Sequence, residues 1–142
     1  MKIGLTIKLT ESFDAVSEAH LLGLMDAITE TAFEAEGIAK SESAVELGAQ
    51  RASIFVVTPT SSNYAPAAAE AAQLRPGVEI FPEPAKPSRH EVLLAVGVNY
   101  AYWNEVLGKP FVGPAMDQAM PGLEEKARQT VGSQLAKVIK IS

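Results

Sequence analysis

Few residues in this sequence have the types and spacing that enzyme chemistry needs. The 142-residue chain contains no cysteine, which excludes a disulfide framework, a thiolate metal site and a cysteine nucleophile. His90 and Glu105 would act as a general acid and base only if the fold placed them in one pocket, and a structural role is the commoner reason for such residues. A phosphate-binding loop, a paired-glycine nucleotide motif and a serine elbow are all missing from the sequence. We therefore predict that the protein is not an enzyme.

The sequence also offers no convincing metal or cofactor ligands. Asp117, Glu124 and Glu125 are acids of one segment, but hard cations are usually held by a dedicated loop, which the sequence does not show. His20 lies beside two leucines and is expected at a helix surface or at the edge of the core. We predict that the protein binds no metal and no cofactor.

Charge is unevenly distributed along the chain. The formal net charge is -5, so the strongly basic surface typical of nucleic-acid-binding proteins is not expected. Residues 11–36 contain seven acids and no Lys or Arg, whereas residues 126–142 contain four bases and no acid. This asymmetry indicates either complementary faces, within one subunit or between neighbours, or simply solvated helix faces.

The first third of the chain is predicted to form a strand and a long acidic helix. Residues 1–9 alternate between apolar and polar positions, which indicates a half-buried strand. Ser12 or Asp14 can cap the helix that follows, and its apolar residues recur at helical spacing. Gly37 is expected to interrupt this helix. A continuation through Val45, Ala49 and Ala52 is predicted to lead to residues 53–57, which either end the helix or form a short strand.

The rest of the chain is predicted to contain a long loop, a strong strand and a terminal helix. Residues 58–88 hold six of the nine prolines and are expected to be a loop or extension, with one or two helical turns at 67–74 and a short strand at 78–81. Residues 91–98 are rich in Val and Leu and are predicted to form a strand. An amphipathic helix from residue 116 to 138 is expected to start or kink at Pro121. The chain length fits a single domain, residues 1–142, and no stretch is apolar enough to cross a bilayer, so no membrane is expected as a partner.

Three aromatic residues, Tyr100, Tyr102 and Trp103, come together before a turn at residues 108–110. Such side chains bury a large area while keeping a polar tip, which suits an interface and a core equally well.

The segment that starts at this point resembles the neck and tail-component family of long-tailed bacteriophages. In that family a strand leads to a Tyr-Ala pair, an acid, a glycine turn, a Pro-Phe segment and a Pro-Ala pair that opens the last helix. The matching positions here are Tyr100 and Ala101, Glu105, Gly108, Pro110 and Phe111, and Pro114 and Ala115. The chain departs from the family pattern after Pro59, where Thr60 to Tyr64 replace a Thr-Gly-x-Leu turn, and at Val106-Leu107-Gly108 in place of Phe-Gly-Thr.

The resemblance implies an α+β fold, in which a small, mostly antiparallel sheet packs with helices on one face. These helices would be the N-terminal acidic helix and the C-terminal amphipathic helix. It also implies a structural role as a virion protein of the phage neck, made in the host cytoplasm during assembly. Copies of the chain would form a ring, with a hexamer favoured over a dodecamer, between the head-connector proteins and the tail proteins. DNA would contact the protein only while passing through the axial channel.

Within such a ring, the acidic helix is expected to face the channel and to repel the phosphate backbone. The candidate channel-facing residues are Glu18, Asp26, Glu30 and Glu34. The basic terminal helix of one subunit is expected to meet the acidic helix of the next. The candidate residues for subunit or ring interfaces are Tyr100, Tyr102, Trp103, Phe111, Lys137 and Lys140.

An alternative of a different class is a small acidic binding or assembly-chaperone module that acts as a monomer or dimer. A hydrolase is a third and weaker alternative, which a cleft built around a perturbed carboxylate would support.

Overall fold

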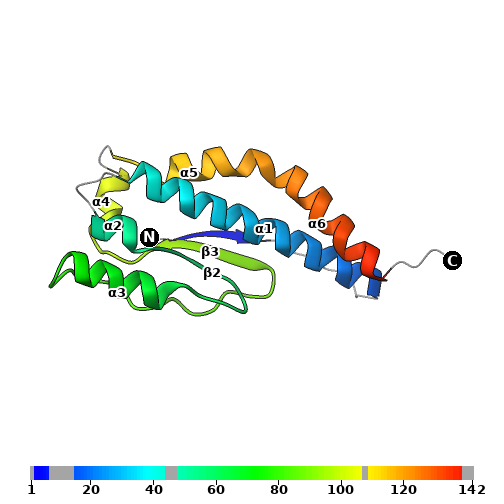
Figure 1. Ribbon diagram of the computed structural model, residues 1–142, viewed down its shortest axis with the longest axis horizontal. Coiled ribbons are helices and arrows are strands. Elements are labelled where there is room, and N and C mark those ends of the chain that lie inside the picture. Colours follow the sequence, from blue (N-terminus) through cyan, green and yellow to red (C-terminus); the bar gives the residue numbers. More distant parts are fainter. Residues whose placement is uncertain (1, 7–14, 44–47, 107–108, 139–142) are drawn as a thin grey trace.

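A three-stranded antiparallel sheet forms the centre of the molecule. The computed structural model describes residues 2–6, 15–43, 48–106 and 109–138. Strands β1 (Lys2–Thr6), β2 (Ile54–Val57) and β3 (Glu91–Val96) lie in the order β1-β3-β2, with both neighbouring pairs antiparallel. Leu94 of β3 pairs with Ile3 on one side and with Val56 on the other. The predicted α+β class and the small antiparallel sheet are confirmed (Figure 1).

The central strand β3 is buried on both faces. Val92, Leu94 and Val96 belong to the larger core cluster, whereas Leu93 and Ala95 belong to a second cluster on the opposite face. A strand covered on both sides needs apolar residues at every position. This explains why its sequence is a continuous Val- and Leu-rich run rather than an alternating one.

The long helix α1 (Ala15–Glu42) covers one face of the sheet. Ile28, Ala32, Ala35 and Ala39 recur at steps of three and four residues and are almost fully buried against β2 and β3. Gly37 does not interrupt the helix, so this prediction was wrong. A single exposed glycine costs a helix only about 1 kcal/mol, and the buried residues on either side of Gly37 hold α1 in place.

A short helix follows α1. Helix α2 (Gly48–Ala52) leads directly into β2, so residues 54–57 form the strand that was one of two expected possibilities. Ala49 and Ala52 lie in α2 as predicted, whereas Val45 lies outside the described residues.

The Pro-rich segment is more regular than its composition suggests. The helical piece predicted at 67–74 is confirmed and is longer than expected, because helix α3 spans Tyr64–Leu74 (11 residues) within the predicted loop at 58–88. Pro66 lies in the first turn of α3, where its missing N–H would have had no helical partner. The strand predicted at 78–81 is reduced to one isolated bridge between Ile80 and Val98.

Helix α3 and the chain after it lie on the face of the sheet that α1 leaves uncovered. Phe55, Leu93 and Ala95 pack there with Ala67 of α3, and Tyr64 stacks edge-on against Phe55 with 5.1 Å between the ring centroids. Helix α1 therefore covers one face of the sheet, and α3 with the chain after it covers the other (Figure 1). The expectation that the helices pack on one face was wrong.

The C-terminal third forms three further helices beyond β3. These are α4 (Ala101–Val106), α5 (Val112–Ala119) and α6 (Leu123–Val138), and the 3-10 turn η2 (Met120–Gly122) joins α5 to α6. Pro121 lies in η2, at the start of the last helix, as predicted. Figure 1 shows α1 between the sheet and the α5–α6 segment, with α6 running alongside α1.

Helices α1 and α6 touch through their backbones. A Cβ atom added to Gly23 would lie 2.7 Å from the backbone nitrogen of Val131 and 2.9 Å from the carbonyl oxygen of Thr130. The Thr130 hydroxyl donates a hydrogen bond to the Gly23 carbonyl oxygen at the same crossing point.

No helix among the described residues is long and apolar enough to span a membrane.

Candidate interaction surfaces

Glu105 joins α4 to the start of α5. Its Oε2 accepts hydrogen bonds from the backbone N–H groups of Phe111 (2.7 Å) and Val112 (3.0 Å), and its Oε1 accepts one from Gly113 (2.7 Å). The first N–H groups of a helix have no partner within the helix, and a carboxylate also interacts favourably with the positive end of the helix dipole. Glu105 is therefore a structural cap for α5.

The structure does not bring His90 to Glu105. His90 immediately precedes β3, whereas Glu105 lies in α4 beyond the other end of that strand, which spans roughly 20 Å. His90 Nε2 is buried without a hydrogen-bond partner. The two residues are too far apart to work as an acid–base pair.

Phe111 was predicted at an interface between subunits, and this prediction was wrong. Its side chain is fully buried and belongs to the core cluster that includes Ala101, Val112 and Ala115. A side chain with no exposed surface has nothing to present to another subunit, and Phe111 therefore serves the core of its own chain.

Two of the other predicted interface aromatics are well exposed. Tyr102 and Trp103 of α4 expose 50% and 59% of their surface, and their rings meet edge-on at 5.3 Å. Val106, one turn further on, is 57% exposed. We call Tyr102, Trp103 and Val106 the aromatic end. Tyr100 is only half-exposed, since it packs against the main core cluster, and the guanidinium of Arg75 lies 4.9 Å from its ring centroid.

Buried contacts hold the aromatic end in position. Ala101 is fully buried at the start of α4, and the side-chain amide of Asn104 donates a 2.6 Å hydrogen bond to Oε1 of Gln50. Gln50 is itself 1% exposed and donates to the Ser43 hydroxyl at the end of α1. The exposed aromatics thus belong to a short helix that is hydrogen-bonded to α2, and α2 is hydrogen-bonded in turn to Ser43 at the end of α1.

The four predicted channel-facing acids do not share one face of α1. At about 100° per residue, Glu18 and Glu34 lie roughly 160° apart around the helix. Glu18 forms a 3.0 Å ion pair with Arg89, on the side of α1 that faces the turn before β3. Asp26, Glu30 and Glu34 instead follow one another at four-residue steps along the side of α1 that borders α6. We call these three residues the acidic row.

The basic terminal helix covers the acidic helix of the same chain. Lys126 of α6 forms an ion pair with Glu34, and Gln134 donates a 2.8 Å hydrogen bond to Asp26. Helix α6 packs on α1 of its own chain, so the sides of these two helices that face each other are not open to a neighbouring subunit. Lys137 is exposed in the last turn of α6, and Lys140 lies outside the described residues.

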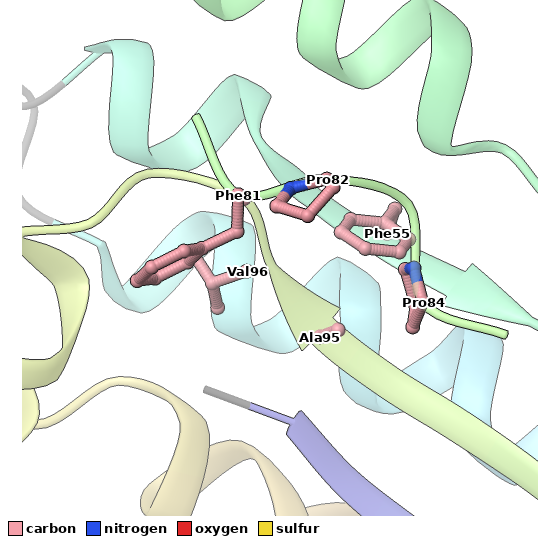
Figure 2. Close-up of a pocket in the computed structure, with 7 residues that line it drawn as sticks. Phe55, Phe81, Pro82, Pro84, Ala95 and Val96 are labelled. Carbon is pink, nitrogen blue, oxygen red and sulfur yellow. The ribbon is translucent and has the colours of Figure 1, made fainter. Parts of the chain in front are cut away.

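The described residues form surface grooves that could not be predicted from the sequence, because each groove combines distant segments. The Phe81 groove, of about 380 Å³, lies between the sheet and the Pro-rich segment and is lined by Phe55, Phe81, Pro82, Pro84 and residues 95–97. Figure 2 shows Pro82 and Pro84 on the segment that passes over Phe55 and β3. The segment is anchored there by the Phe81 N–H, which donates to the Gly97 carbonyl oxygen, and by Tyr64, whose hydroxyl donates to that of Phe81.

The second groove, of about 460 Å³, lies beside the N-terminal half of α1. We call it the α1 groove. Leu21, Leu22 and Met25 line it together with residues 58–61 of the turn after β2, and Glu18, Asp26 and Arg89 supply its charges.

The comparisons with known proteins add no relative, since no family model, no curated protein and no solved structure matches the chain. Among the described residues, no group of three or more His, Cys, Asp or Glu side chains is placed to hold a metal ion.

Proposed function

We propose that the chain is a structural protein of the neck of a long-tailed bacteriophage. In this proposal, copies of the chain form a ring, six in preference to twelve, that joins the head connector to the tail. The ring leaves an axial channel through which DNA passes. The protein would be made in the host cytoplasm and would act in the virion.

The observation that carries the proposal is the role of Glu105. The described residues on which the family resemblance depends belong to one structural unit, and Gly108 lies outside the described residues. Tyr100 immediately precedes α4, which begins at Ala101 and contains Glu105. Pro114 and Ala115 lie near the start of α5. The three hydrogen bonds of the Glu105 carboxylate join these parts. A motif whose acid builds a helix junction supports a structural protein better than an enzyme.

The acidic row is the surface that we propose for the channel. Asp26 and Glu30 are exposed and carry their negative charge, whereas Lys126 offsets the charge of Glu34. Carboxylates on a channel wall repel DNA phosphates and prevent the counterion-releasing contacts that would hold the DNA in place.

Electron microscopy of phage particles that contain this protein tests the proposal. The expected result is a closed ring of density on the tail axis at the junction with the head. Density away from that axis, together with a monomer or dimer in solution, would refute the neck assignment and favour the small binding or assembly-chaperone module.

A further inference from the structure

Helix α6 is attached to the rest of the molecule mainly through α1, alongside which it runs (Figure 1). The α1–α6 contact is the most extensive one between two elements of the described chain. Among the described residues of α6, only Leu123 at its start packs against a core cluster, and Val131 and Leu135 are half-buried. A helix that contributes so little to the core can be released without unfolding the rest.

The side of α1 beneath α6 also lies outside the core. Ala19, Gly23 and Ala27 follow one another at four-residue steps, so they share one side of the helix. Gly23 meets the backbone of α6, and Ala19 and Ala27 are buried although neither belongs to a core cluster. Departure of α6 therefore exposes only small side chains on α1, whereas α6 itself exposes Val131 and Leu135 and needs another α1 to cover them.

Polar contacts specify which helix fits on this side of α1. They join Lys126 to Glu34, Thr130 to Gly23, and Gln134 to Asp26. The helices are antiparallel, since the contact near the start of α6 lies further along α1 than the contact near its end. Every copy of the chain carries the same donors and acceptors, so α6 of a second copy fits this side of α1 as well as the chain's own α6 does.

The connection between α5 and α6 has the features of a hinge. None of the η2 residues is buried, and Met120 and Pro121 are exposed. Pro121 has no N–H to continue the helical hydrogen bonds, and Gly122 has no side chain to restrict its backbone. The backbone is helical on either side, at Ala119 and at Leu123. Rotation about a few exposed bonds can therefore move α6 as a unit.

We propose that α6 of one copy leaves its own α1 and packs on α1 of a second copy when the protein assembles. The α1–α6 contacts are the same in both arrangements, so the exchange leaves no donor or acceptor of this contact without its partner. The balance between the two arrangements then depends on the hinge and on the protein concentration. Stable assemblies need an extensive contact between copies, and the exchange turns the most extensive contact of the chain into one.

The exchange also gives the contact a direction. Each copy donates one helix and receives one, so the donating and receiving surfaces differ and the contact is head-to-tail. Such contacts generate closed rings when the rotation between copies suits. The closure of a ring rests on the proposed function, whereas the exchange between copies does not.

Cross-linking of single cysteines tests the exchange cleanly, because the natural chain has no cysteine. Asp26→Cys protein and Gln134→Cys protein are expressed together, and a short bismaleimide cross-linker is added to the purified protein. Each substitution removes one hydrogen bond and leaves the other polar contacts of α6 intact. Because each chain carries one cysteine, a link between the two variants forms efficiently only when α6 of one copy lies on α1 of the other.

The matched control is the pair Glu79→Cys and Asn99→Cys. Both pairs of natural side chains are joined by exposed 2.8 Å hydrogen bonds, but Glu79 and Asn99 lie beside the Ile80–Val98 bridge and not on a terminal helix. Groups held in contact experience a millimolar effective concentration, so we expect roughly tenfold or more linked dimer for the α1–α6 pair than for the control. Equal yields for the two pairs would overturn the proposal.

Charge reversal tests the exchange without a cross-linker. Lys126→Glu and Glu34→Lys each place like charges at the α1–α6 contact of their own chain. Mixing the two variants restores opposite charges at both contacts only if the helices are exchanged. We expect native mass spectrometry to show the mixed complex favoured roughly three- to tenfold over the complexes of either variant with itself, and this preference should shrink with added salt. A mixture without such a preference would show that α6 stays on its own chain.

The two proposals fail separately. A ring at the phage neck without Asp26–Gln134 cross-links between copies contradicts the exchange and leaves the neck function standing. Such cross-links in an assembly that does not lie at the neck contradict the neck function and leave the exchange standing.

Discussion

Helices α5 and α6 follow each other in the chain and pack on the same helix, yet their environments differ. Val112, Ala115 and Ala119 of α5 are at most 1% exposed, whereas every residue of α6 for which burial is described is at least partly exposed. Helix α5 shares the main core cluster with α1 and the sheet, but α6 contacts α1 beyond it. The start of α5 is also held by Glu105, while α6 is held by close packing of its backbone on α1 at Gly23 and by polar contacts at the surface.

The difference in burial indicates that α5 contributes more than α6 to the stability of the whole fold. Buried apolar area is the main source of stability, and surface ion pairs contribute little. Damage to α5 should therefore lower the free energy of global unfolding. Damage to α6 should release that helix locally and leave the rest folded.

The strongest test of this contrast is Phe111→Ala. Removing a fully buried phenylalanine should lower the free energy of unfolding by about 3–5 kcal/mol, measured by urea denaturation. Trp103→Ala is the control, because its side chain is 59% exposed and its loss should change the stability by only about 0.5 kcal/mol. Equal losses for the two variants would contradict the assignment of Phe111 to the core.

Glu105→Gln should have the next largest effect. The substitution removes the charge and one of the two acceptor oxygens that serve three backbone N–H groups, which should cost about 2–3 kcal/mol. Thermal and urea unfolding measure the loss. Glu124→Gln is the matched control, since Glu124 has an exposed partner in Arg128 and should cost about 0.5 kcal/mol or less. If the two variants are equally stable, the Glu105 cap does not hold α5.

Gly23→Ala should act mainly on α6. The added methyl group would collide with the backbone of Thr130 and Val131, and overpacking of this kind costs about 1–3 kcal/mol. We expect faster hydrogen exchange in α6 and unchanged exchange in β3. Gly132→Ala adds the same group where nothing lies within 4 Å, and it should slightly stabilise α6. Faster exchange in β3 as well would mean that α6 and the core unfold together.

The smallest effect is expected for the ion pair between Lys126 and Glu34. Its side chains are 23% and 44% exposed, so a double-mutant cycle with Lys126→Met and Glu34→Gln should give a coupling energy below about 1 kcal/mol. The coupling should shrink further as salt is added. A coupling energy of several kcal/mol that resists salt would make this pair a main support of α6.

The elements with strong local patterns were predictable. The Val- and Leu-rich run of β3 and the helical spacing in α1 both identify elements whose buried faces are dictated by periodicity. The break predicted at Gly37 was wrong, and the helical piece predicted at 67–74 was too short, for one reason. A glycine or a proline biases only its own backbone, and packing of the surrounding helix can outweigh that bias.

The candidate surfaces were predictable only in part. Tyr102 and Trp103 could be proposed for an interface from their chemistry, but nothing in the local sequence separates them from Phe111, which is equally aromatic and fully buried. The acids of α1 could be counted in the sequence. Which of them face Arg89 and which face α6 could not be predicted. The two grooves could not be foreseen at all, since each is lined by segments that only the fold brings together.

The local sequence located the strand β3 and the long helix α1, and it showed that charge is divided between an acidic early segment and a basic end, while the α+β class was expected from the family resemblance. Only the tertiary structure decided that these two charged segments pair within one chain, that Glu105 caps α5, and that the aromatic end stands free. The physical reason is one of range. Periodicity and propensity act over a few residues, whereas burial and pairing depend on which distant segments share the same core.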